Sequence, residues 1–152
     1  MLEVGSAAPA FSLAADSGEA ISLASLLGRQ VVLFFYPRDS TIGCTIEACD
    51  FRDSWPAVQR AGAVVLGIST DDAASHQKFR RRFKLPFPLL VDADHAVAEA
   101  YGAWGQRSLF GYRYHGILRT TFLIDAGGRI KRIFEKVKPM GHAAQVLEAL
   151  SA

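Results

Sequence analysis

Two uninterrupted apolar runs constrain the fold of this chain more than any other feature of its sequence. The runs are VVLFFY (residues 31–36) and AVVLGIS (residues 63–69), and both are rich in β-branched or aromatic side chains. Continuous apolar runs of this length are typical of strands buried on both faces of a sheet, and such strands are usually parallel. Parallel neighbours need a long crossover connection, which is usually a helix. The sequence therefore predicts a strand–helix–strand unit.

The remaining segments extend this unit into a single α/β domain over residues 1–152. They are predicted to form, in chain order, a hairpin turning at Asp16-Ser17-Gly18, a helix from about Gly43 that Pro56 kinks or restarts, a helix over 71–84, a strand over 87–92, a short helix ending at Gly102, a loop over 104–116, a hairpin over 118–135 and a C-terminal helix. This order implies a mixed, partly parallel sheet with helices on both faces. We expect the aromatic residues of the loop to pack around it.

Composition and charge exclude several classes of function. The chain has 152 residues, of which 50% are apolar, and its net charge of +2 gives no reason to expect a nucleic-acid or membrane surface. The basic run KFRRRFK (78–84) is predicted to be the solvated face of an amphipathic helix. The N-terminus does not resemble a signal peptide, and no apolar run reaches the ~20 residues of a membrane span. We therefore expect a cytoplasmic location, where a close cysteine pair is more often catalytic or metal-binding than structural.

The two cysteines of the chain, Cys44 and Cys49, lie together in STIGCTIEAC. If Thr41 is the N-cap of the helix, its hydroxyl is expected to accept a hydrogen bond from the backbone N–H of Cys44; Ser40 would serve equally well with the frame shifted by one. Either cap leaves Cys44 in the first turn, where unpaired N–H groups and the helix dipole stabilise a thiolate and lower the thiol pKa from about 8.5. Cys44 is therefore the candidate nucleophile.

Cys49 lies five positions further along the same predicted helix. Cα atoms at this separation are more than ~7 Å apart, about the upper limit for a disulfide, so a Cys44–Cys49 bond would require the first turns to unwind. A metal site is not predicted, because zinc needs further cysteine or histidine ligands at short spacing. A Cys-x-x-Cys redox motif is also absent. The four histidines show no ligand spacing and are expected on the surface or in loops: His76, His95, His115 and His142.

The segment FFYPRDSTIGCTIEACDFRD resembles the active site of the peroxiredoxins. Their signature, Pro-x-x-x-Thr/Ser-x-x-Cys, matches Pro37, Thr41 and Cys44. The second cysteine and the following FRD are similar to the bacterioferritin comigratory protein or PrxQ branch, and the similarity continues through LGISTDD and LRTTFLIDAGGRI over nearly the whole chain. The resemblance implies a thioredoxin-like fold, with a central mixed sheet flanked by helices and an N-terminal β-hairpin extension.

The resemblance also implies a thiol-dependent peroxidase that reduces hydrogen peroxide and organic hydroperoxides. Cys44 would attack the peroxide and become a sulfenic acid, and Cys49 would resolve it as an intramolecular disulfide. Thr41 and Arg119 would donate hydrogen bonds to the departing oxygen, and Pro37 would shield the pocket. Thioredoxin, or alternatively glutaredoxin, would reduce the disulfide. No cofactor or metal is implied.

Two residues add detail to this resemblance. Ile42 stands where most members of the branch have proline, whose ring would fix φ at the first helical position. We therefore expect the first turn to unwind more easily in this chain. Glu47, one turn beyond Cys44, is expected to orient Arg119, although its negative charge would oppose a thiolate.

Two other functions would use the same cysteines. A thiol–disulfide oxidoreductase acting on proteins would exchange disulfides without consuming peroxide. A peroxide-sensing redox partner would be oxidised at Cys44 but would turn over negligibly with any reductant. We expect the protein to be a monomer, because the sequence contains no obvious exposed apolar strand.

Overall fold

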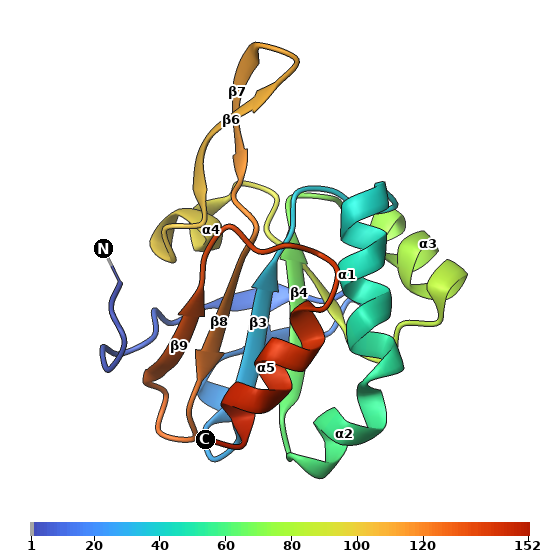
Figure 1. Ribbon diagram of the computed structural model, residues 1–152. Coiled ribbons are helices and arrows are strands. Elements are labelled where there is room, and N and C mark those ends of the chain that lie inside the picture. The colour runs from blue at the N-terminus through green and yellow to red at the C-terminus, as the bar shows by residue number, and fades with distance from the viewer. Residues whose placement is uncertain (1) are drawn as a thin grey trace.

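A central five-stranded sheet organises the computed structural model, which describes residues 2–152 (Figure 1). In spatial order its strands are β5 (Leu89–Val91), β4 (Val64–Ser69), β3 (Val31–Phe35), β8 (Thr120–Ile124) and β9 (Ile130–Phe134). β3 is parallel to β4 and antiparallel to β8. β4 and β5 are parallel, whereas β8 and β9 form an antiparallel hairpin. The predicted mixed sheet is confirmed.

Helices cover both faces of this sheet. They are α1 (Ile42–Asp53), α2 (Trp55–Arg60), α3 (Ala73–Phe83), α4 (Ala96–Ala100), α5 (His142–Leu150) and the 3-10 segment η1 (Ala24–Leu26). Alternate side chains of β3 enter two apolar cores. Val32 and Phe34 join the core beneath α1 and α5, which stand in front of the sheet in Figure 1, while Leu33 and Phe35 join the core beneath α4. Burial on both faces explains why the strand has no polar positions. No helix within residues 2–152 is both long and apolar enough to cross a bilayer.

Most predicted local elements are confirmed. The N-terminal hairpin pairs β1 (Ser12–Ala14) with β2 (Ala20–Ser22). The helix that follows β3 ends at Asp53, with Ser54 as its C-cap, and Pro56 lies in the first turn of α2, where a proline costs no intrahelical hydrogen bond. α3 begins after Asp72, whose carboxylate accepts the backbone N–H of Ser75. Three arginines occupy its last turn, in agreement with the helix dipole.

The loop predicted over 104–116 is wrong, because this segment forms a hairpin. β6 (Trp104–Leu109) pairs antiparallel with β7 (Tyr112–Ile117), and the hairpin projects away from the sheet (Figure 1). Phe110 and Gly111 both have positive φ, as a tight two-residue turn requires. Two of the three glycines that suggested a loop lie within the strands, where Gly105 pairs with Gly116. The aromatic tip is exposed rather than packed, and the Phe110 side chain is 100% exposed.

The expectation that all four histidines lie on the surface or in loops is wrong for two of them. His76 and His142 are buried, and each is bonded through both ring nitrogens. His142 contacts the Thr121 hydroxyl at 2.8 Å through Nε2 and Gln145 at 3.1 Å through Nδ1. A histidine can enter a core when it is satisfied in this way. Apart from Gln145, which lies on α5 with His142, the partners come from other elements, so spacing along the chain did not reveal them.

Candidate active site

The connection from β3 to α1 places Cys44 at the start of a helix. Thr41 has extended backbone angles and occupies the N-cap, so α1 begins at Ile42 and Cys44 is its third residue. The predicted position of Cys44 in the first turn is confirmed, and Thr41 rather than Ser40 is the cap residue. Ser40 instead has a positive φ of 61°, which non-glycine residues rarely adopt. Pro37 is half-buried at the start of this connection.

The Thr41 hydroxyl does not form the predicted capping bond. It turns back into the connection and donates to the carbonyl oxygen of Arg38 at 2.9 Å. This bond closes a turn that brings the chain into the helix. Because its hydrogen is already donated, the Thr41 hydroxyl presents its oxygen lone pairs to a further partner.

Arg119 lies directly against the Cys44 thiol. Its Nη2 atom is 3.3 Å from Cys44 Sγ, and its Nη1 atom donates to Glu47 Oε1 at 2.7 Å. Arg119 precedes β8, and the pairing of Phe35 with Thr120 brings the start of β8 to the end of β3, where α1 begins. Burial lowers the pKa of Arg119, but the neighbouring Cys44 and Glu47 raise it by more. Arg119 therefore remains a cation beside the sulfur.

A glycine in the first turn permits this close approach. A Cβ atom on Gly43 would lie 3.1 Å from Arg119 Nη2 and 3.4 Å from the Pro139 ring. The first of these distances is tighter than most Cβ contacts, so a larger residue would displace the guanidinium. Cys44 itself is 1% exposed. The thiol thus lies at the apolar core beneath α1 and α5, with the guanidinium as its hydrogen-bond partner.

Glu47 is a fully buried carboxyl group on the next turn of α1. Burial raises its pKa to about 7, although the charge and hydrogen bond of Arg119 lower it and the nearby Asp50 adds a smaller rise. Its Oε2 atom has no hydrogen-bond partner among residues 2–152. The expected contact between Glu47 and Arg119 is present. Because burial outweighs this contact, the Glu47 carboxyl group titrates near neutral pH.

Replacing Glu47 with glutamine should change the pH dependence of stability. Because the folded-state pKa lies above the ordinary 4.5, ionised Glu47 destabilises the fold, and this penalty develops as the pH rises from about 4.5 through 7. The shift corresponds to about 3 kcal/mol. Relative to wild type, Glu47→Gln should therefore be more stable at pH 8 than at pH 5 by most of this amount, because only a small part of the penalty is present at pH 5.

Urea denaturation of the reduced proteins at both pH values, followed by circular dichroism, measures this difference. Glu148→Gln, on the exposed face of α5, removes the same charge without burial and is the control. An equal effect of Glu47→Gln at the two pH values would contradict the raised pKa.

Cys49 lies further along the unbroken helix α1 and is partly buried. Both cysteines are free thiols, which agrees with the expectation that an intact helix keeps them apart. Burial raises the pKa of Cys49; Arg52 lowers it and Asp53 raises it by smaller amounts. Cys49 is therefore a protonated thiol at neutral pH. Ile42, at the first helical position, is 84% exposed and gives the helix start little packing support.

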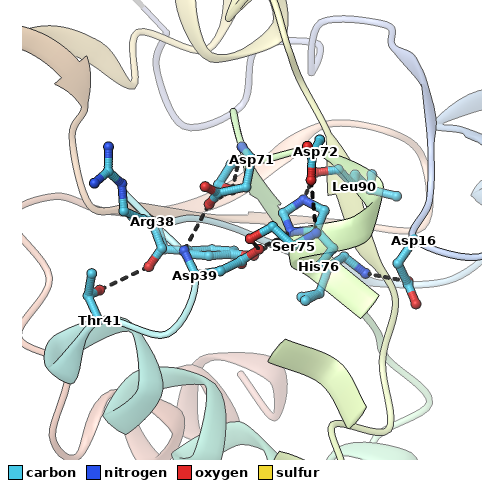
Figure 2. Close-up of polar contacts among 12 residues, drawn as sticks. Asp16, Arg38, Asp39, Thr41, Asp71, Asp72, Ser75, His76 and Leu90 are labelled. Atoms are coloured by element: carbon cyan, nitrogen blue, oxygen red, sulfur yellow. Dashed lines mark hydrogen bonds and ion pairs between the residues drawn. The ribbon is translucent and has the colours of Figure 1, made fainter. Parts of the chain in front are cut away.

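A group of polar residues that the sequence did not point to holds the β3–α1 connection against α3 and the end of β4 (Figure 2). His76 Nδ1 is 2.6 Å from Asp39 Oδ2, and the backbone N–H of Asp39 donates to Asp71 Oδ2 at 2.8 Å. These three side chains lie close enough together to suggest a cation site. Their polar atoms are instead bonded to one another and to neighbouring hydroxyl groups, so the group is a hydrogen-bonded network. Asp39 lies 32 positions before Asp71 and 37 before His76, so the group left no local signal.

A cavity of about 790 Å³ adjoins Arg119 on the side of β8 and β9. Neither Cys44 nor Thr41 lines it, so it does not open on the thiol. Its apolar lining includes Tyr101, Leu118, Phe122, Ile133 and Val137.

Comparisons with known proteins identify the family and the fold. The model of the AhpC/TSA family matches residues 4–133. A peroxiredoxin Bcp of Bacillus subtilis is 46% identical over 149 residues, covering 98% of this chain and 95% of the relative. The bacterioferritin comigratory protein of Xanthomonas campestris, whose structures concern alkyl peroxide reduction, has a TM-score of 0.90 at 36% identity, covering 99% of this chain and 96% of its own. A cysteine-to-serine mutant of PrxQ from Xylella fastidiosa has a TM-score of 0.93 at 30% identity, with the same coverage.

Proposed function

This chain belongs to the AhpC/TSA family and is a peroxiredoxin, a thiol-dependent peroxidase with a thioredoxin-like fold, and on that premise we propose that Cys44 is the residue that reacts with peroxide. The observation that carries the assignment is the 3.3 Å contact between Arg119 Nη2 and Cys44 Sγ. A permanent cation at this distance favours the thiolate, which is the nucleophilic form of cysteine. Arg52 lies near Cys49, but the pKa of the Cys49 thiol is nevertheless raised.

In the proposed reaction the Cys44 thiolate attacks one peroxide oxygen. The oxygen–oxygen bond breaks, Cys44 becomes a sulfenic acid, and the departing oxygen leaves as hydroxide or alkoxide and takes up a proton. Arg119 stabilises the negative charge that develops on the departing oxygen. The Thr41 hydroxyl, whose hydrogen is donated to Arg38, accepts a hydrogen bond from hydrogen peroxide and orients it. Pro37, at the start of the same connection, shields the pocket from water.

We propose Cys49 as the resolving residue. The Cys49 thiol condenses with the Cys44 sulfenic acid, forming a disulfide and releasing one water molecule. Because both cysteines lie on the intact helix α1, the first turns must unwind before the sulfur atoms meet. The exposed Ile42 at the first helical position favours this unwinding. Both cysteines belong to one chain, so the cycle can be completed by a monomer.

A dithiol protein must then return two electrons and two protons to the disulfide. We propose thioredoxin, with glutaredoxin as the alternative, since the cytoplasm keeps such dithiols reduced. The decisive experiment measures hydrogen peroxide consumption by the wild-type protein with thioredoxin, thioredoxin reductase and NADPH. Sustained NADPH oxidation that depends on peroxide is expected. Consumption of one equivalent followed by arrest with either dithiol would indicate a sensor, and disulfide exchange without peroxide consumption would indicate an oxidoreductase.

Replacing Cys49 with serine should uncouple the two half-reactions. The variant should reduce about one equivalent of peroxide and then stall with Cys44 as sulfenic or sulfinic acid, because no internal thiol resolves it. Mass spectrometry of the stalled protein identifies the oxidised residue. Full thioredoxin-dependent turnover by Cys49→Ser would contradict the resolving role alone. Far-UV circular dichroism of the wild type provides a separate check, since oxidation to the disulfide should lower the helix content.

A further inference from the structure

The connection between β3 and α1 is tied to α3 by a buried pair that the peroxide reaction does not use directly. Asp39 lies in the connection and His76 in α3, and their relative exposures are 6% and 0%. His76 Nδ1 is 2.6 Å from Asp39 Oδ2 (Figure 2). A contact this short between a carboxylate and a buried imidazole is a strong, charge-assisted interaction.

The surroundings of His76 identify it as a cation. Its Nε2 atom is 2.8 Å from the carbonyl oxygen of Leu90, which can only accept a hydrogen bond. Its Nδ1 atom faces Asp39, so both ring nitrogens point at acceptors. Burial lowers the pKa of His76, but the hydrogen bond and charge of Asp39, the Leu90 carbonyl and the charge of Asp71 together raise it by more. Asp39 is thereby paired with a buried positive charge.

Further hydrogen bonds fix Asp39 in a single position. Its carboxylate accepts the hydroxyl groups of Tyr36 at 2.6 Å and Ser75 at 2.9 Å. Its backbone N–H donates to Asp71 Oδ2, which also accepts the Ser69 hydroxyl at 2.7 Å. Asp39 is thus held through its side chain and its backbone by Tyr36, which directly follows β3, by Asp71, which follows β4, and by α3.

The next two residues are those that present the reactive helix. Ser40 has the unfavourable positive φ, and Thr41 donates to Arg38 and occupies the N-cap position of α1. A strained backbone persists only where its surroundings hold it in place. We propose that the Asp39–His76 pair is the positioning device of the active site: it holds the connection in the conformation that presents Thr41 and Cys44 to peroxide, and its release accompanies the unwinding that lets Cys44 reach Cys49. This inference rests on the proposed function, with His76 as a positioning residue.

Three variants separate positioning from general stability. His76→Gln and Asp39→Asn remove the charge of either partner with little change in volume. Arg80→Gln is the matched control, because Arg80 also lies on α3 and forms an ion pair, at 3.0 Å, but with Asp16 near the N-terminal hairpin. Mixing each reduced protein with hydrogen peroxide measures the oxidation of Cys44 and the later formation of the disulfide as separate steps.

His76→Gln and Asp39→Asn should each slow the oxidation step by about 10-fold or more, because small displacements of reacting groups are costly. Disulfide formation should be unchanged or faster, since the helix start is released. Arg80→Gln should change both steps by less than about 3-fold. Equal slowing of both steps, or an equal effect of the control, would overturn the positioning role.

A readout without peroxide tests the tether even if the proposed function fails. Hydrogen–deuterium exchange of residues 38–46 should be about 10-fold faster in His76→Gln than in wild type and unchanged in Arg80→Gln. If a charge variant does not fold, Tyr36→Phe should show a smaller increase in exchange, because it removes a hydroxyl that donates to Asp39 and also lies 3.4 Å from His76 Nδ1 but leaves both charges in place. Unchanged exchange in every folded variant would overturn the inference, whatever the peroxidase assay shows.

The wild type provides a final test through its pH dependence. Because the pKa of His76 is raised, the charged pair is present below that pKa and is lost as the pH rises through it. Exchange of residues 38–46, corrected for the intrinsic pH effect, should therefore rise across this range in wild type but not in His76→Gln. Glu47 also titrates near this segment, but it is present in both proteins and cancels in the comparison. Superimposable pH profiles of the two proteins would contradict the tether.

Discussion

Replacing Cys44 with serine should abolish peroxide reduction. A serine hydroxyl is not ionised near neutral pH, even beside the Arg119 guanidinium, so the variant lacks a nucleophile for the peroxide oxygen. We expect the rate to fall by at least about 10⁴-fold, as happens when other catalytic nucleophiles are removed. The coupled assay with thioredoxin, thioredoxin reductase and NADPH measures this loss.

The matched control is Cys49→Ser, which makes the same chemical change on the same helix. It should consume the first equivalent of peroxide, whereas Cys44→Ser should consume none. The circular dichroism spectra of the two reduced variants should match that of wild type, because the structure holds both cysteines as free thiols. Steady turnover by Cys44→Ser would remove the basis of the proposed mechanism.

The second large effect is expected from Arg119→Met. Methionine retains much of the side-chain length and removes the charge that contacts Cys44 Sγ at 3.3 Å. Loss of such a preorganised electrostatic partner typically costs about 10²–10³-fold in rate, and we expect this decrease in the second-order rate constant for hydrogen peroxide. Arg119→Lys should recover only part of it, since an ammonium group cannot contact both Cys44 and Glu47 as the planar guanidinium does.

A double variant separates catalysis from stability at this site. Arg119→Met leaves the buried Glu47 carboxyl without its partner at 2.7 Å, which destabilises the fold at alkaline pH. Adding Glu47→Gln should restore stability but not the rate. Arg113→Met, which removes an exposed arginine from β7, controls for the change in net charge and should leave the rate unchanged. A near-normal rate in Arg119→Met would show that Arg119 does not stabilise the transition state.

Some physical features of this fold leave a pattern in the sequence, and others do not. The apolar runs of β3 and β4 were identified because strands buried on both faces have no polar positions. The hairpin over 104–116 was missed because its tip residues are exposed and its glycines mimic a loop. The direction of the Thr41 hydroxyl was also missed. A threonine at this position can either cap the helix or donate back to Arg38, and the residue type alone does not distinguish the two bonds.

The sequence by itself determined the strand–helix–strand order, the place of Cys44 in the first turn of α1, and a spacing that keeps Cys44 and Cys49 apart while that helix is intact. These features depend on interactions within a few residues along the chain, and local patterns report them. Only the tertiary structure decided which groups face the sulfur and what holds the connection before α1. Arg119 reaches Cys44 across 75 positions, and His76 reaches Asp39 across 37, because β3 lies between β8 and β4. Electrostatic and hydrogen-bonding partners are chosen by distance in space. Which residues pair is therefore decided only when the sheet brings distant segments to one edge.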